Sequence, residues 1–241
     1  ALETQVDDCG PAVTEEEKAQ VRGGSKLLGN QSACPFRAFA QHRLHVESAD
    51  AGDAALSSRE RGILLHAALR HLWDLLSDSH TLRQMTGTER REHCRNAARV
   101  AVSGFDRWRR RIVGDALLAL EAQRLESLLQ RWLQTEDARP VDFVVETREE
   151  QQSISLGGLK LDLQVDRIDR LADGGRLIID YKSGGGSVAD WLGERPAAPQ
   201  LPLYALASGG DAAGITFAAV NRDKPGFTGL ADAEYAAGIR D

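Results

Sequence analysis

The sequence lacks any run of apolar residues long enough to cross a membrane. Its first ten residues, ALETQVDDCG, contain neither the basic segment nor the apolar segment of a secretory signal. We therefore expect a cytoplasmic protein with no membrane partner. The first residue, Ala1, and the ending GIRD also indicate a domain taken from a longer polypeptide.

Cysteine is scarce, and several well-known motifs are missing. Cys9, Cys34 and Cys94 are odd in number and widely spaced, which is typical of reduced thiols and provides no CxxC pair of zinc ligands. There is no G-x-x-x-x-G-K-[ST] phosphate-binding loop and no G-x-S-x-G nucleophile elbow. These absences argue against P-loop nucleotide hydrolases, serine hydrolases and cysteine-bound zinc.

The chain has no overall excess of positive charge. Its 30 basic and 36 acidic side chains give a net charge of −6, which argues against a uniformly basic nucleic-acid-binding surface. The charges are unevenly placed, with an acidic stretch at residues 1–17 and a basic cluster at Arg107, Arg109, Arg110 and Arg111. The cluster has two open interpretations, a phosphate-binding face or a solvated helix face.

The first half of the chain shows helical patterns. We expect an acidic tail over 1–23 and one domain over 24–241, with a helical part at 24–138. Ser57 and Glu60 have capping-box spacing before a helix near 58–77, and Thr86 and Glu89 repeat it before a polar helix to about Arg111. The apolar positions expected on the first helix are Ile63, Leu64, Leu69, Leu72, Trp73 and Leu76. A third helix is expected to carry an apolar stripe of Leu118, Leu125, Leu128, Leu129 and Trp132.

The second half, residues 139–241, is rich in strand patterns. The segments VDFVVE, SISL, LKLDLQVDRI and RLIIDYK predict a β-meander, with Gly157-Gly158 joining the second segment to the third. PQLPLYALAS then predicts a short helix, and GITFAAV predicts a closing apolar strand. We therefore predict an α/β (α+β) fold in which a βββαβ sheet is covered by helices.

Acidic residues interrupt two of these strands. In VDRIDRLADGGRLIIDYKSGG, alternation places Asp180 and Lys182 on one face of a strand, with Tyr181 on the other face. A two-residue turn at Gly174-Gly175 would place Asp166 opposite Ser183 and beside Lys182, and a longer turn would shift this register by a residue or so without separating them. Two carboxylates and one ammonium group would then converge.

Such a pair of carboxylates is unfavourable unless the two groups share a proton or a cation. Mg²⁺ or Mn²⁺ favours oxygen ligands and commonly uses one or two protein carboxylates. Lys182 could then orient water and stabilise charge on a phosphoryl oxygen. The alternative is a partly exposed ion pair between Asp180 and Lys182 without any metal.

The order D-x(13)-D-x-K, followed by PQLPLYA, resembles the PD-(D/E)xK nuclease superfamily, and in particular its RecB-type nuclease domains. CPFRAFAQHRL at 34–44 and RGILLH at 61–66 are similar to the N-terminal helical elements of RecB-like and AddB-like nuclease domains. Together with DRIDR and IDYKSG, these motifs resemble the nuclease region of bacterial DNA repair exonucleases. The resemblance implies a restriction-endonuclease-like core with a central mixed sheet.

The resemblance also assigns roles to individual residues. It implies that Asp166 and Asp180 bind Mg²⁺ or Mn²⁺, that Lys182 is catalytic, and that His66 and the carbonyl of Tyr181 add ligands. His66 could otherwise be a core histidine bonded to a carbonyl. Gln200 and Tyr204, four residues apart on one helix face, would contact phosphate or Lys182, or else only pack.

Two departures from the family pattern concern single residues. Val165 stands where the superfamily name has proline, as is common in the RecB-type branch. Some relatives bind an iron–sulfur cluster through one upstream and three C-terminal cysteines, and Cys34 matches only the upstream one. Because no cysteine follows Cys94, we expect no cluster and a small buried role for Cys34.

The resemblance implies a metal-dependent deoxyribonuclease, the nuclease module of a helicase-like DNA repair or recombination protein. Its partners would be single-stranded or duplex DNA ends and a helicase-like region of the same or a partner chain. The alternative is a catalytically silent nuclease fold that binds DNA or assembles partners.

Overall fold

The helical part predicted from the sequence is present. The computed structural model of the chain describes residues 12–21, 23–47, 55–209 and 211–240, so Cys9 lies outside the described residues. The helices before the sheet are α1 Glu15–Gln20, α2 Gly24–Ala33, α3 Pro35–Ala38, the π-helix η1 Phe39–Arg43, α4 Ser58–Leu76, α5 Ser79–Gln84, α6 Gly87–Ser103, α7 Arg107–Val113 and α8 Asp115–Asp137. No helix in the described ranges has the length and apolarity needed to span a membrane.

Local sequence signals explain where the long helices begin and end. The predicted capping boxes form, Ser57 with Glu60 at the start of α4 and Thr86 with Glu89 at the start of α6. The expected single helix to Arg111 is wrong, because α6 ends at Ser103 and Asp106 caps the separate helix α7. Ile63 lies on α4 as expected, but its side chain is 56% exposed, whereas the other expected apolar positions of this helix are buried.

The second half forms a mixed six-stranded sheet in the order β1-β2-β3-β4-β5-β6. Strands β3 and β4 are parallel, as are β5 and β6, and the other neighbours are antiparallel. The elements are β1 Phe143–Leu156, β2 Leu159–Leu171, β3 Arg176–Lys182, the 3-10 helix η2 Val188–Trp191, α9 Gln200–Ala207, β4 Ala212–Ala219, β5 Gly226–Ala231 and β6 Ile239–Arg240. The mixed sheet with flanking helices confirms the predicted fold class.

The expected strand list needs two corrections. VDFVVE and SISL belong to one long strand, β1, because the polar residues between them continue the ladder with β2. GITFAAV, which forms most of β4, does not close the sheet, because the shorter strands β5 and β6 follow it. Their small and polar residues gave no strong alternating pattern.

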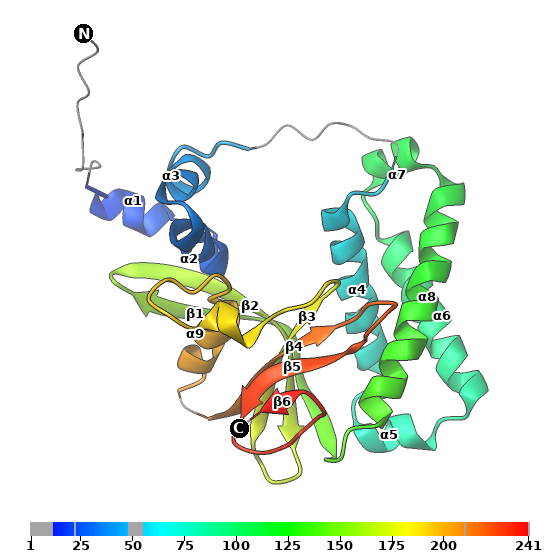
Figure 1. Cartoon of the computed structure of the whole chain (residues 1–241). Helices are drawn as coiled ribbons and strands as arrows, with labels where there is room; N and C mark the ends of the chain where they lie inside the picture. The colour runs from blue at the N-terminus through cyan, green and yellow to red at the C-terminus, as the bar shows by residue number, and fades with distance from the viewer. Residues whose placement is uncertain (1–11, 22, 48–54, 210, 241) are drawn as a thin grey trace.

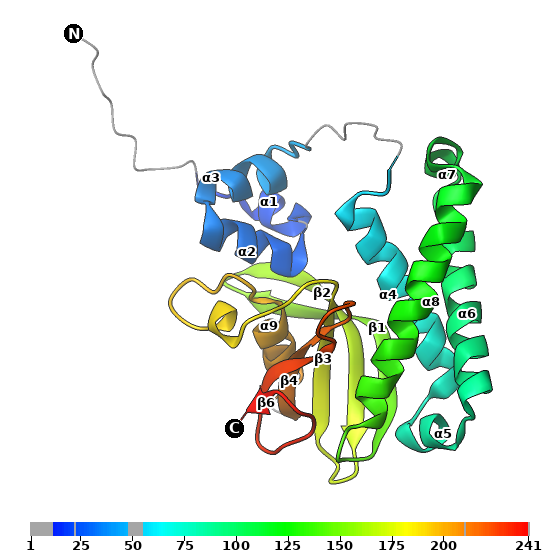
Figure 2. The same ribbon diagram turned by 45° about the vertical axis from the view of Figure 1, so that its right-hand side comes forward.

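Helices cover both faces of the sheet (Figure 1 and Figure 2). One core joins α4, α6 and α8 to residues such as Leu177, Ile179 and Tyr181 of β3. The other joins α9 and η2 to Ile178 and to the opposite face of β2. Strand β3 is therefore buried on both sides, which explains why its acid at position 180 is also buried.

The N-terminal segment also contains ordered structure. Glu15–Gln20 form α1, and Glu17 pairs with Arg43 of η1 at 2.8 Å. Cys34 is only partly buried, which corrects the expectation of a buried role, whereas Cys94 is fully buried between the helices. The domain limits at residues 23 and 138 remain predictions.

Candidate active site

The site begins with two residues of β3. The Asp180 side chain is 1% exposed, and the Lys182 ammonium Nζ lies 2.6 Å from its Oδ2 atom. The Lys182 side chain is 37% exposed, so the lysine leads from the buried carboxylate to the surface. The predicted sharing of one strand face by these two residues is therefore confirmed.

Asp166 of β2 reaches the same place, but in a different register from the one predicted. Arg170 pairs with Arg176 and Arg167 with Ile179, which is three residues from the register of a two-residue turn. The connection is longer because Leu171 and Gly175 hold a wider turn, closed by the bonds from the Leu171 amide to the Gly175 carbonyl and from the Gly174 amide to the Leu171 carbonyl. Asp166 is thus not opposite Ser183, and its Oδ2 accepts the Tyr181 amide at 2.8 Å.

Helix α4 contributes His66. Its Nδ1 atom lies 3.2 Å from Oδ1 of Asp166, and its side chain is 32% exposed. The His66 and Tyr181 rings are also nearly perpendicular, with 6.2 Å between their centroids. A carboxylate in the site holds His66, so the alternative of a core histidine bonded to a carbonyl is not what the structure shows.

Burial of charge dominates the electrostatics of the site. Burial raises the pKa of the Asp180 carboxyl to about 6, the charge of Asp166 adds to the rise, and the Lys182 ammonium opposes it. Burial by itself lowers the pKa of His66, but the hydrogen bond and charge of Asp166 outweigh it and leave that pKa raised. Negative charge is therefore in excess around the two carboxylates, and a nearby cation is favoured.

The donor set fits a hard divalent cation. Two carboxylates, one of them buried with a raised pKa, are groups whose charge such an ion would neutralise. In the present arrangement Asp180 pairs with Lys182 and Asp166 with His66, and in the described part of the chain no three His, Cys, Asp or Glu side chains are placed to share one ion. The ligand role of the Tyr181 carbonyl remains a prediction.

Helix α9 brings Gln200 and Tyr204 together. The Gln200 side-chain amide donates to the Tyr204 hydroxyl at 2.9 Å, and Tyr204 is 1% exposed in the second core. Burial raises the pKa of the Tyr204 hydroxyl, and the charges of Asp166 and Asp180 raise it further. Tyr204 therefore packs and also holds Gln200 in place.

The sequence analysis missed a buried charged network behind β3. The Arg167 guanidinium donates to Asp169 at 2.6 Å, to Glu136 of α8 at 2.6 Å and to the Tyr181 hydroxyl at 3.1 Å. Arg139 also donates to Asp169, at 2.6 Å. The alternation in DRIDR was the available signal, because it places Arg167 and Asp169 on the same face of the strand.

Comparisons with known proteins identify the family of the chain. The family model described as PD-(D/E)XK nuclease superfamily matches residues 29–233, and no curated protein matches the chain. A solved structure described as "Crystal structure of SSO0001" is similar over 84% of this chain and 74% of that chain, with 14% identity and a TM-score of 0.26, which is too low to support an argument. The family match spans most of the chain and includes the segments that carry Asp166, Asp180 and Lys182, so the chain belongs to the PD-(D/E)XK nuclease superfamily.

Proposed function

We propose that the chain is a Mg²⁺- or Mn²⁺-dependent deoxyribonuclease of RecB/AddB-like type that acts as an exonuclease. The observation that carries this proposal is the meeting of His66, Asp166, Asp180 and Lys182 from three elements at one place. The family match suggests nuclease activity in general. The proposed setting is cytoplasmic DNA repair or recombination, with a helicase-like region of the same or a partner chain supplying DNA ends.

Each residue of the site would have a distinct role in the reaction. Asp166 and Asp180 would hold the ion, together with His66 and the Tyr181 carbonyl, and the bound ion would supply Lewis acidity and a water of lowered pKa. Lys182, at the mouth of the site, would stabilise negative charge on the phosphate being cleaved. Gln200, fixed by its bond to the Tyr204 hydroxyl, would orient the same phosphate.

One observation favours the alternative of a silent DNA-binding fold. The Lys182 ammonium already neutralises Asp180, so the carboxylate pair is partly stabilised without a metal ion. In that case the site would be a structural ion pair, and the nuclease fold would serve only for binding.

Cleavage of end-labelled single-stranded and duplex DNA tests the proposal. Cleavage should appear with Mg²⁺ or Mn²⁺ and disappear in excess chelator, because the carboxylates would then lack their cation. Ca²⁺, whose coordination is looser, should support little turnover. Full cleavage in chelator would rule out the metal-dependent mechanism, and no cleavage under any metal would favour the silent fold.

A further inference from the structure

Helix α7 presents an aromatic side chain to solvent among arginines. Trp108 is 68% exposed, whereas the other tryptophans of the chain, Trp73, Trp132 and Trp191, are at most 6% exposed. Arg107 and Arg111 are also exposed, and their spacing places them on the same side of the helix as Trp108. Within the described residues neither arginine forms an ion pair. An exposed tryptophan beside two guanidinium groups combines a stacking surface with positive charge, the two features that single-stranded nucleic acids bind.

Arginine is in excess along α6 and α7. Residues 87–113, which span these helices, contain eight arginines against three acidic residues. Four of the arginines pair with acids of other elements, and within the described residues Arg107 and Arg111 supply the unpaired positive charge of α7. The ligand expected for such a local excess is a polyanion.

The helix is fixed in place from its other side. The Arg109 guanidinium donates to Glu60 of α4 at 2.6 Å and to the Ala55 carbonyl at 2.8 Å. Arg110 pairs with Asp115 of α8 at 2.9 Å. Two arginines of the cluster are thus structural, and they hold α7 so that Arg107, Trp108 and Arg111 face outward.

Exposed residues also lie on α4, between the end that Arg109 of α7 contacts and the active site. Glu60, to which Arg109 is bound, follows Arg59 in the first turn of α4. Arg59, Ile63 and His66 lie on one face of α4, and a rise of about 1.5 Å per residue separates Arg59 from His66 by roughly 10 Å. Arg59 and Ile63 are both exposed. In Figures 1 and 2, α7 lies beside the N-terminal end of α4.

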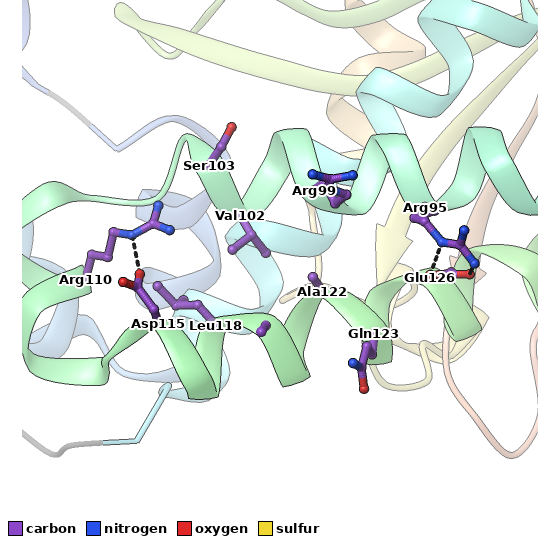
Figure 3. Close-up of a pocket in the computed structure, with 11 residues that line it drawn as sticks. Arg95, Arg99, Val102, Ser103, Arg110, Asp115, Leu118, Ala122, Gln123 and Glu126 are labelled. Atoms are coloured by element: carbon purple, nitrogen blue, oxygen red, sulfur yellow. Dashed lines mark hydrogen bonds and ion pairs between the residues drawn. The ribbon is translucent and has the colours of Figure 1, made fainter.

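A groove between α6 and α8 is the competing candidate on the same layer. It has a volume of about 520 Å³ and contains Arg95, Arg99 and Arg110 (Figure 3). Its two ends are closed by ion pairs, Arg95 with Glu126 and Arg110 with Asp115. Because these acids neutralise two of its three arginines, the groove is a weaker anion site than the outer face of α7.

We propose that the outer face of α7, continued by Arg59 and Ile63 of α4, binds single-stranded DNA. The ring of Trp108 stacks on an unpaired base, and Arg107, Arg111 and Arg59 contact phosphates of the strand that enters or leaves the site at His66. Unpaired bases are required because a duplex hides their faces, whereas aromatic–base stacking is a general means of holding single strands. This inference rests on the proposed nuclease function, for which it names the substrate form and its track.

Tryptophan fluorescence tests this proposal without any cleavage. In excess chelator, an oligothymidylate should quench the emission of the wild-type chain, and it should protect Trp108 from acrylamide. Trp108→Ala should abolish this quenching and weaken binding, measured by anisotropy of labelled oligonucleotide, about tenfold, since stacking of one base contributes about 1–3 kcal/mol. Trp108→Tyr should restore most of the affinity.

Matched variants separate stacking from charge. The double variant Arg107→Ala/Arg111→Ala should lower the slope of log affinity against log salt by about 1.4, because each single-strand phosphate contact contributes about 0.7. Arg170→Ala, at the far end of β2, and Leu75→Ala, at the far end of α4, remove an exposed arginine and an exposed leucine and should change neither readout.

Several results would overturn the inference. Unchanged oligothymidylate affinity in Trp108→Ala, or equal quenching by blunt duplex DNA or by polyglutamate, would exclude base stacking at α7. Because binding is measured without metal, quenching by single strands in a chain that never cleaves DNA would leave this inference standing while the nuclease proposal fails. Cleavage of DNA without any quenching of the tryptophan emission would support the nuclease proposal and overturn this inference.

Discussion

At the scale of single residues, the site holds an acid where the protein alone would favour an amide or an apolar group. Asp180 lies in a strand that is buried on both faces, and burial raises its pKa to about 6. Lys182 offsets only part of this cost. A residue that is costly to the fold and also lies beside Asp166 and His66 is more readily explained by chemistry than by stability.

Asp180→Asn should therefore stabilise the chain in the absence of metal. Because the pKa of Asp180 is raised in the folded state, its carboxyl keeps its proton between about pH 4 and 6. Above that range the carboxyl is ionised, and the full cost of burying its charge lowers the stability of the folded chain. The variant should gain on the order of 2–3 kcal/mol in urea unfolding at pH 8, and the gain should shrink towards pH 5. Asp223→Asn, at an exposed aspartate in the turn between β4 and β5, is the control and should show no such trend. Destabilisation of Asp180→Asn at pH 8 in chelator would show that the carboxylate is held by its ion pair.

Lys182→Ala separates the nuclease from the silent fold. The carboxylates remain, so metal-free DNA binding should persist, while cleavage should fall by orders of magnitude through loss of charge stabilisation at the phosphate. Loss of the ammonium also removes the group that lowers the pKa of Asp180. Lys160→Ala, an exposed lysine near the β1–β2 turn, controls for the loss of one positive charge. Cleavage by Lys182→Ala at the wild-type rate would mean that this lysine has no catalytic role.

At the scale of elements, the Arg167 network ties the helical layer to the sheet directly behind the site. Glu136 extends from α8, Arg167 and Asp169 from β2, and Tyr181 from β3. The Arg167 guanidinium also lies 3.8 Å from the ring centroid of Trp73 on α4, the helix that carries His66. Buried charges of this kind are weak evidence for stability as a set, but removing one partner leaves the others uncompensated.

Glu136→Gln should cost several kcal/mol of unfolding free energy, measured by urea denaturation followed by far-UV circular dichroism. The reason is that Arg167 and Arg139 would then share one carboxylate, Asp169, in a region without solvent. Glu126→Gln on the same helix breaks the more exposed pair with Arg95 and should cost less than about 1 kcal/mol. Equal costs for the two variants would mean that the network relaxes around the loss.

The elements also show what local sequence patterns can and cannot predict. The capping boxes, the apolar stripes of α4 and α8 and the pairing of two acid-bearing strands follow from spacing alone, and the structure contains all of them. The register of β2 and β3 depends on the hydrogen bonds that hold Leu171 and Gly175, which composition does not specify. The break after Ser103 depends on Asp106 capping α7, a signal that the surrounding arginines concealed. The contact between His66 and Asp166 spans 100 positions, so the residues themselves could not reveal it and only the family resemblance indicated it.

At the scale of the whole molecule, charge is divided between regions. The acidic residues of the first 17 positions and the arginines of α6 and α7 belong to different parts of the chain, and Glu17 is already paired with Arg43. A net charge of −6 therefore does not describe the surface that DNA would meet. Affinity should follow the local arginine excess, while the acids of the first eleven residues act through a field that salt screens.

Removing residues 1–11 tests this separation. The deletion eliminates Glu3, Asp7 and Asp8 and no basic residue, so the net charge changes from −6 to −3, while the pair of Glu17 with Arg43 is kept. At physiological salt, where the screening length is about 8 Å, the affinity for oligothymidylate in chelator should stay within about twofold of the full chain. Near 0.01 M salt, where that length is about 30 Å, the affinity of the shortened chain should exceed that of the full chain, because the repulsion between Glu3, Asp7 and Asp8 and the DNA is removed. The measurement is anisotropy of labelled oligonucleotide across a salt series, with Arg107→Ala/Arg111→Ala as the variant that should lose affinity. A loss of tenfold or more on deletion would place DNA-binding groups in the first eleven residues and move the binding surface away from α7.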